Sequence, residues 1–279
     1  MRLLDRHVLL TGATGTIGRH LAAQLVARGA RVTLVARTAD PLAALGQALG
    51  AEALPADLTD PGAHAGVVAA AEHRSGPVDV VVHNAAVETV GRLDELDDGD
   101  VERTVALNLT APLSLTRLLL PGMLARGSGH VVMLSSLAGV ATFPGLAVYG
   151  ATKAGLTHAT AALRIELRGT GVGTTVAEVG PVASAMMDRA RRHPVSGFSF
   201  ARAQRLGALR DLDPHDVARS VLDAVEAERP SVRLPRRVAP LAAVSALPRD
   251  LVRVVLSGAP SREPMPAPHD ALDPTGSDR

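Results

Sequence analysis

The chain has 279 residues, of which 47% are hydrophobic, and its formal net charge is +1. This length and apolar content suffice for one large α/β domain, and the small net charge argues against general nucleic-acid binding. The absence of cysteine excludes disulfide bonds and cysteine-ligated metals, and no metal site is expected. Since no apolar run approaches the roughly 20 residues that span a membrane, and no leader peptide is evident, the chain is expected to be cytoplasmic.

The first predicted elements are a strand at His7–Thr11, a glycine-rich turn and a helix that continues to Ala27. This order predicts a cradle for a dinucleotide pyrophosphate, because glycine allows backbone N–H groups and the helix N-terminus to approach the phosphates. The residues of the predicted cradle are Gly12, Thr14, Gly15, Thr16, Ile17 and Gly18.

The second predicted strand, Arg31–Ala36, ends at Arg37, where many NAD-binding folds carry an acidic residue for the ribose hydroxyls. A guanidinium can bind a 2′-phosphate in a bidentate fashion, whereas a carboxylate would repel it. We therefore expect NADP(H) to be favoured over NAD(H). A solvated arginine at a strand end, with NAD(H) as the cofactor, is the alternative.

Two further predicted strands are each followed by residues suited to a ligand site. The expected elements are a helix over 41–49, a strand at Ala53–Ala56, a helix at Pro61–Ser75 and a strand at Val78–His83. The first strand is followed by Asp57 and Leu58, and the second by Asn84, Ala85 and Ala86. Small residues at the end of a parallel strand allow a ring or ribose to lie against the backbone, although this tripeptide is also compatible with a turn.

Asn108 lies among apolar residues in a long helical pattern at Asp97–Arg126. A buried asparagine must find hydrogen-bond partners, so Asn108 is either a structural bridge or part of a site. The fifth predicted strand, His130–Leu134, then brings Ser136 to the edge of the sheet where ligands bind.

Tyr149 and Lys153 are the only tyrosine and the only lysine of the chain. At a spacing of four they share one face of a helix, predicted at Tyr149–Arg168. A nearby cation lowers the pKa of a phenol from its usual value of ~10, which predicts a proton donor and acceptor. Alone, however, the pair is also compatible with an ordinary surface contact.

The sixth predicted strand, Gly173–Val179, completes an alternation of strands and helices. Near-continuous apolar strands predict a doubly wound parallel sheet with helices on both faces, in a single domain over 1–230. Within it, 185–209 is expected to be irregular, and Asp213 is expected to cap a helix over 214–228.

The C-terminal part has a different composition. Residues 231–258 form an arginine-rich amphipathic extension, and 259–279 are predicted to be disordered because they are rich in proline and polar residues. The arginines over 233–256 suit a solvated cover over the core, with a membrane-surface or subunit contact as the alternative.

Together these residues resemble the short-chain dehydrogenase/reductase family in its classical form, over about 7–230. The glycine loop departs from the classical spacing, since Thr16 replaces the second glycine as in the family's extended branch. His83, Ala86 and Val179 also replace the usual Asn, Gly and Pro. The resemblance implies a catalytic tetrad of Asn108, Ser136, Tyr149 and Lys153, an adenine contact at Asp57, and nicotinamide contacts at Gly180, Val182 and Ser184.

The resemblance implies an NAD(P)-dependent oxidoreductase that interconverts a ketone or aldehyde and a secondary alcohol, acting as a homodimer or homotetramer. Tyr149 would exchange the proton, Ser136 would hold the carbonyl oxygen, and Lys153 would lower the phenol's pKa and bind the ribose, while Asn108 would hold a relay water. The alternatives are a non-catalytic NADP(H)-binding regulatory module and a membrane-peripheral reductase of lipid or acyl carbonyls.

The predicted substrate pocket is apolar and offers no arginine for a substrate carboxylate. We therefore expect a hydrophobic substrate. The residues expected to line the pocket, besides Ser136 and Tyr149, are Leu137, Ala138, Phe143, Pro144, Met186, Met187, Phe198 and Phe200.

Overall fold

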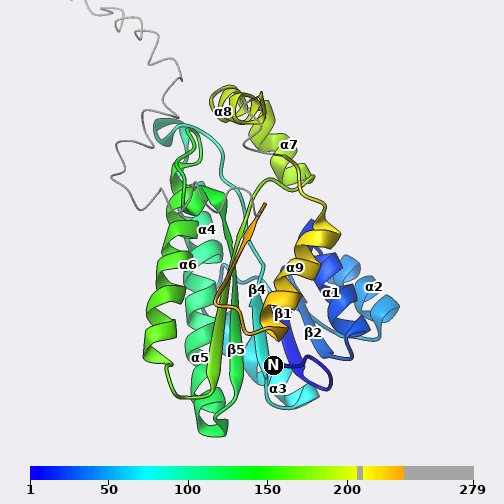
Figure 1. The fold of residues 1–279 in the computed structure, drawn as a ribbon. Coiled ribbons are helices and arrows are strands. Elements are labelled where there is room, and N and C mark those ends of the chain that lie inside the picture. The colour runs from blue at the N-terminus through cyan, green and yellow to red at the C-terminus, as the bar shows by residue number, and fades with distance from the viewer. Residues whose placement is uncertain (206–209, 236–279) are drawn as a thin grey trace, which may run out of the picture.

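A seven-stranded parallel sheet forms the centre of the computed structural model, which describes residues 1–205 and 210–235 (Figure 1). The strand order is β3-β2-β1-β4-β5-β6-β7. The strands are β1 (His7–Thr11), β2 (Arg31–Ala36), β3 (Glu52–Pro55), β4 (Val80–His83), β5 (Gly129–Ser136), β6 (Val172–Val179) and β7 (Ser231–Leu234). The predicted doubly wound fold is thus confirmed, and the first two strands have the bounds expected from the sequence.

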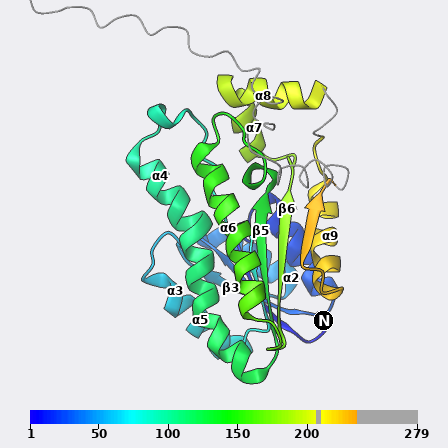
Figure 2. The same ribbon diagram turned by 60° about the vertical axis from the view of Figure 1, so that its left-hand side comes forward.

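Helices cover both faces of the sheet. The helices are α1 (Thr16–Ala27), α2 (Ala39–Leu49), α3 (Ala63–Ser75), α4 (Asp98–Val105), α5 (Ala111–Arg126), α6 (Ala147–Glu166), α7 (Ala185–Arg192), α8 (Pro194–Arg205) and α9 (Pro214–Glu226). Figures 1 and 2 show α1, α2 and α9 on one face and α3, α4, α5 and α6 on the other. Both views place α7 and α8 beyond one end of the sheet.

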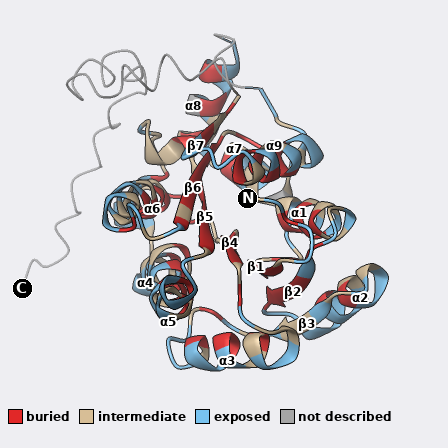
Figure 3. Ribbon diagram, turned by 60° about the horizontal axis from the view of Figure 1, so that its bottom comes forward, coloured by how far each residue is buried: buried red, intermediate tan, exposed pale blue. Residues whose placement is uncertain are grey.

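Buried side chains alternate between the two faces along each central strand, as the period of a strand requires. In β5, Val132 and Leu134 join the core cluster beneath α1 and α9, whereas Val131 and Met133 join the cluster beneath α3, α5 and α6. Figure 3 shows the central strands almost wholly buried and the outer surfaces of the helices exposed, whereas the edge strand β3 has no buried residue. This two-sided burial explains why the strands are near-continuous apolar runs.

The strand order places a ligand crevice between β1 and β4. The chain moves outward from β1 through β2 to β3 and then crosses back to β4, which pairs with the other side of β1. Because the strands are parallel, their carboxyl ends share one edge, and ligands of such sheets bind where the direction of winding reverses. The polar residues after β1, β4 and β5 therefore meet at this edge.

The segment expected to be irregular over 185–209 contains two helices. Ser184 caps α7, since its side chain accepts a hydrogen bond from the Met187 N–H at 3.2 Å. Pro194 begins α8 at a position where its missing N–H costs nothing. The prediction of irregular structure was wrong because both helices are short and polar, and so lack a long apolar stripe.

Two other regions also differ from expectation. β7 pairs with β6, so the sheet continues to Leu234, beyond the expected domain end at 230. The long helical pattern contains a π-helical turn, Ala106–Thr110, between α4 and α5. The expected cap of α9 is confirmed, since Asp213 accepts a hydrogen bond from the His215 N–H at 2.7 Å. Most of the arginine-rich extension and all of the tail lie outside the described residues.

Candidate active site

A pocket of about 500 Å³ opens at the carboxyl edge of the sheet. Loops that follow the first six strands contribute to its lining, together with α6, α7 and α8. Of the predicted cofactor residues, the pocket is lined by Gly12, Thr14, Gly15, Thr16, Ile17, Arg37, Asp57, Leu58, Asn84, Ala85, Ala86, Tyr149, Lys153, Gly180, Val182 and Ser184. Segments far apart in the sequence thus converge as the motifs predict.

The glycine loop forms a cradle that side chains would fill. Gly12 has φ +66°, and a Cβ there would lie 2.6 Å from the Cα of Ala85. Gly18 does not line the pocket but packs beneath the loop, where a Cβ would collide with the Gly12 carbonyl oxygen. Gly15 precedes α1 without any side-chain cap, so the first N–H groups of the helix remain available for an anion. These features fit a bound pyrophosphate.

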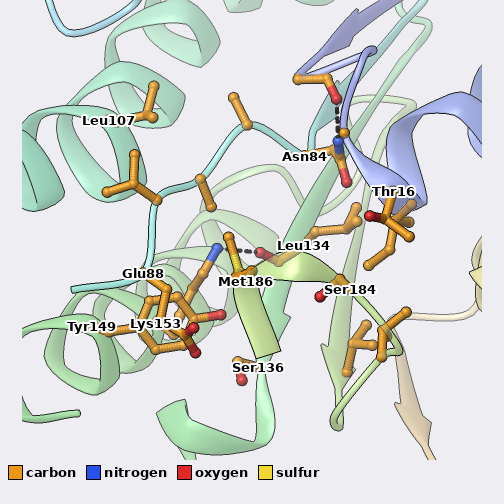
Figure 4. Close-up of a pocket in the computed structure, with 18 of the residues that line it drawn as sticks. Thr16, Asn84, Glu88, Leu107, Leu134, Ser136, Tyr149, Lys153, Ser184 and Met186 are labelled. Carbon is orange, nitrogen blue, oxygen red and sulfur yellow. Dashed lines mark hydrogen bonds between the residues drawn. The ribbon is translucent and has the colours of Figure 1, made fainter. Parts of the chain in front are cut away.

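Thr11 and Asn84 join the loops after β1 and β4. The Thr11 hydroxyl accepts hydrogen bonds from the backbone N–H groups of Asn84 and Ala85, both at 3.1 Å. The Asn84 amide donates in return to the carbonyl oxygens of Thr11, at 3.1 Å, and Gly12, at 2.9 Å (Figure 4). These hydrogen bonds therefore fix the distance between the two loops that form the walls of the crevice.

The Arg37 side chain is exposed where β2 ends, and Asp57 follows β3, the adjacent strand. Hydrogen bonds from the backbone N–H and hydroxyl of Thr59 lower the pKa of Asp57, and the Arg37 charge lowers it further. An ionised acceptor and a guanidinium thus lie together on the pocket wall, where they could hold the adenosine half of a dinucleotide.

Asn108 is fully buried in the π-helical turn and acts on the loop after β4. Its Oδ1 accepts a hydrogen bond from the Val87 N–H at 2.9 Å, and its Nδ2 donates to the Val87 carbonyl oxygen at 2.8 Å. Nδ2 also lies 3.3 Å from the Thr152 hydroxyl of α6. Asn108 does not line the pocket itself. In this structure it bridges two helices and a pocket loop.

Replacing Asn108 with Ala should lower the free energy of unfolding by about 2–4 kcal/mol. The change leaves the partly buried N–H and C=O groups of Val87 without their Asn108 partners, and each lost partner costs about 1–3 kcal/mol when fully buried. Chemical denaturation would measure the difference. The control is Thr110→Ala, since Thr110 is exposed and lies in the same π-helical turn. An equal loss of unfolding free energy in both variants would contradict the bridging role of Asn108.

Ser136, Tyr149 and Lys153 all line the pocket at the end of β5 and the start of α6. The Ser136 hydroxyl accepts a hydrogen bond from the Ala138 N–H at 3.1 Å, which leaves its own proton available for a bond with the Tyr149 phenol. The Lys153 amine donates to the Leu134 carbonyl oxygen at 2.9 Å and lies 5.7 Å from the centroid of the Tyr149 ring (Figure 4). The predicted pair therefore faces one pocket.

The pKa of Tyr149 is shifted in the direction opposite to the prediction. Burial of the ring raises this pKa, the Glu88 carboxylate raises it further, and only a hydrogen bond with Ser136 lowers it. No lowering of the Tyr149 pKa by Lys153 offsets these effects, and burial lowers the pKa of the Lys153 amine itself to about 8. The expected lowering was wrong for this arrangement because the amine lies against the ring face and donates to Leu134.

The opposite wall is apolar. Phe143 and Phe200 stack with ring centroids 5.5 Å apart, and both line the pocket with Leu137, Met186 and Met187. Two predicted residues do not line it. Phe198 is 45% exposed on the outside of α8, because it lies two positions before Phe200 and so on a different face of the helix. Pro144 is also absent from the lining.

The departures from the family pattern differ in their consequences. His83 points into the core, where its Nε2 lies 2.9 Å from the Thr116 hydroxyl, and burial lowers its pKa to about 3. The departure at His83 therefore does not alter the lining of the pocket. Ala86 and Val179 do line it.

Glu88 and Arg189 are pocket residues that the sequence analysis missed. Burial raises the pKa of Glu88 to about 7, and the Arg189 charge acts in the opposite direction. Glu88 lies four positions after Asn84, and an acidic residue so close to a buried strand end is the only sequence feature that pointed to it. Arg189 could not be told from the other arginines of a polar segment.

Known proteins with similar sequences belong to the family that the motifs indicated. The family model for short chain dehydrogenases matches residues 6–194. The ketoacyl reductase HetN of Nostoc sp. is 37% identical over 190 residues, or 66% of each chain. The glycine betaine reductase ATRR of Emericella nidulans is 35% identical over 228 residues, which are 80% of this chain and 18% of that protein. The chain thus spans less than two thirds of either relative.

Solved structures agree on the fold. A short-chain dehydrogenase from Streptomyces avermitilis is 30% identical with a TM-score of 0.76, and the match covers 90% of this chain and 94% of that one. A metagenomic short-chain oxidoreductase in complex with NADP is 27% identical with a TM-score of 0.68, covering 83% and 98%. With its sheet order, its glycine cradle and its Ser-Tyr-Lys arrangement, the chain belongs to the short chain dehydrogenase family.

Proposed function

We propose that the chain is an NADP(H)-favouring oxidoreductase that interconverts a hydrophobic ketone and a secondary alcohol, or an aldehyde and the corresponding primary alcohol. The observation that carries the proposal is the convergence of Ser136, Tyr149 and Lys153 on one pocket beside a glycine cradle. The NADP complex of a similar oxidoreductase supports a nicotinamide cofactor, and the exposed Arg37 beside Asp57 is the reason to favour NADP(H). NAD(H) is the alternative.

In this proposal the nicotinamide, when bound, supplies the hydride. Tyr149 gives its phenolic proton to the carbonyl oxygen in reduction and takes it back in oxidation. Ser136 can turn its hydroxyl proton from the Tyr149 phenol to the same oxygen, which stabilises the negative charge that develops there. Lys153 holds a positive charge beside the ring, and its buried amine can also reach a ribose hydroxyl. Asn108 positions the loop that carries Val87 and Glu88.

The substrate class follows from the apolar wall of the pocket. Leu137, Phe143, Met186 and Met187 offer no charge to a substrate, so burial of an alkyl or aryl chain provides the binding free energy. A reductase of lipid or acyl carbonyls at a membrane surface is the second candidate, and none of the described helices is long and apolar enough to cross a membrane.

A panel of ketones and secondary alcohols, followed by nicotinamide absorbance with NADPH and NADH, tests the function. Turnover of apolar ketones with NADPH is the expected result. Tight NADPH binding without turnover of any compound would favour the regulatory, non-catalytic module instead. Cosedimentation with liposomes, compared between the full chain and residues 1–235, separates the membrane-peripheral candidate from a freely diffusing enzyme.

We also propose that the protein forms a homodimer or homotetramer through α5 and α6. Leu113 and Leu124 of α5 are 40% and 43% exposed, and Ile165 of α6 is 67% exposed. Large apolar side chains on adjacent helices favour association. Sedimentation of the full chain and of a variant with aspartate at these three positions measures the assembly state.

Replacing Glu88 with Gln should move the pH profile of alcohol oxidation to lower pH. Oxidation requires Tyr149 without its proton, so the rate rises as pH passes through its pKa. Burial and the Glu88 charge raise that pKa, and the substitution removes the second contribution. Because the pKa of Glu88 itself is about 7, the two enzymes should differ above neutral pH and converge below it. kcat/KM for a simple secondary alcohol, measured from pH 5.5 to 10, checks this.

A further inference from the structure

Glu88 lies in the pocket without a role in the proposed proton transfer. Figure 4 shows it on the same side of the pocket as Tyr149 and Lys153. Its Oε2 atom is buried and has no hydrogen-bond partner among the residues that the structure describes. A buried polar atom without a partner is costly, and in native proteins such atoms are rare. Because the Glu88 side chain also lines the pocket, rotation of its carboxyl group toward a bound ligand would supply the missing hydrogen bond.

The backbone on both sides of Glu88 is fixed. Asn108 binds the N–H and the C=O of Val87. On the other side, the Thr89 hydroxyl is hydrogen-bonded to the Thr104 hydroxyl of α4, which donates to the Asp100 carbonyl oxygen at 2.8 Å. Glu88 is therefore held between two anchored residues, and its carboxyl group occupies a built position.

We propose that Glu88 selects substrates that carry a hydroxyl group close to the reacting carbonyl, by a hydrogen bond between that hydroxyl and its carboxyl group. This inference rests on the proposed carbonyl reduction, because Tyr149 and Ser136 determine where the carbonyl oxygen lies. A hydroxyl group both donates and accepts, so it can pair with the carboxyl group in either protonation state. The substrate would thus be a hydroxy ketone or hydroxy aldehyde with an apolar remainder.

The surrounding charges favour a neutral hydroxyl over an ammonium group. Burial raises the pKa of Glu88 to about 7, so much of the carboxyl population is uncharged near neutral pH. Lys153 and Arg189 already place two cations in the pocket lining. A charged amine would therefore meet two like charges and a carboxyl that offers only part of a countercharge.

Matched ketones test the inference directly. The two ketones of each pair share one carbon skeleton, and one of them carries a hydroxyl group one, two or three carbons from the carbonyl. A third compound of each set carries an amine in place of the hydroxyl group. kcat/KM is measured for the wild-type protein and for the variants Glu88→Leu, Glu88→Gln and Glu102→Leu. Glu102 is the matched control, since it is exposed on α4 and does not line the pocket.

The wild-type protein should prefer one hydroxy ketone over its partner by roughly 10²-fold, because a site built for a hydroxyl leaves its own polar group unpaired when the hydroxyl is missing. Glu88→Leu should bring this ratio to near one, Glu88→Gln should retain part of it, and Glu102→Leu should leave it as in the wild type. Cofactor affinity and thermal unfolding of each variant would confirm that the fold is kept.

Three outcomes would overturn the inference: no hydroxyl preference in the wild type, a preference that survives in Glu88→Leu, or a stronger preference for the amine. If plain ketones are reduced and the ratio stays near one, the inference alone fails. If no compound of any arm is turned over with either cofactor, the proposed function fails with it.

Discussion

Tyr149→Phe should lower kcat for every substrate by roughly 10²–10⁴-fold, the usual contribution of a positioned general acid or base. The substitution removes one oxygen and keeps the ring, so the contact of the ring with Lys153 is retained. Because the buried phenol has a raised pKa, it holds its proton at neutral pH and is ready to donate it in the reductive direction. Steady-state rates for the ketone panel would measure the loss.

Cofactor binding is the internal control for this variant. The glycine cradle, Arg37 and the Thr11–Asn84 hydrogen bonds belong to the loops after β1, β2 and β4, and none of them involves the phenolic oxygen. The substitution therefore leaves them intact. NADPH affinity, measured by fluorescence titration, should therefore be nearly unchanged. A variant that still reduces carbonyls at the wild-type rate would remove Tyr149 from the mechanism, and a variant that no longer binds NADPH would show that the residue acts through structure.

Arg37→Asp should reverse the cofactor preference, with NADPH affinity falling on the order of 10²-fold or more relative to NADH. In the proposed NADPH complex, the substitution would replace a bidentate guanidinium–phosphate pair by a like-charge contact. Both the lost pair and the new repulsion cost more than a neutral hydrogen bond. Asp57, whose carboxyl group has a lowered pKa, stays ionised in both proteins and adds to the repulsion. Dissociation constants for both nucleotides give the ratio.

The matched control for this change is Arg2→Asp. Arg2 is exposed and precedes β1, so it lies at the opposite edge of the sheet, yet its substitution changes the net charge by the same amount. Equal affinities for NADPH and NADH in the wild-type protein would rule out a role for Arg37 in choosing between them. A similar loss of NADPH affinity in both variants would indicate a long-range effect of net charge.

Local patterns were sufficient to predict six of the seven strands of the sheet. The apolar runs at His7–Thr11 and Arg31–Ala36 have the bounds of β1 and β2 because buried parallel strands need apolar side chains on both faces. β7 was missed because its four residues include an arginine, whose side chain pairs with the buried Glu178 of β6. Only the tertiary partner makes such a segment a strand.

The sequence predicted which residues of the Ser-Tyr-Lys group meet at the pocket, but it did not predict the electrostatics there. Spacing placed Tyr149 and Lys153 on one helix face, and the motif order placed Ser136 beside them, because these relations are local or follow from the sheet edge. The direction of the Tyr149 pKa shift depends on burial and on Glu88, which reaches the phenol from another strand end. The spacing of residues along a helix cannot predict this contact between distant segments.

The single lysine of this chain has a consequence for chemical labelling. Lys153 supplies the only ε-amine, is 4% exposed, and has a pKa lowered to about 8, so a useful fraction of it is nucleophilic in mildly alkaline buffer. The α-amine of Met1, the other primary amine, is ion-paired with Glu228 at 2.6 Å. An acylating reagent small enough to enter the pocket would therefore label Lys153 when the pocket is empty and fail to label it when a nucleotide is bound. The mass of the intact protein would distinguish the two cases, without interference from surface lysines.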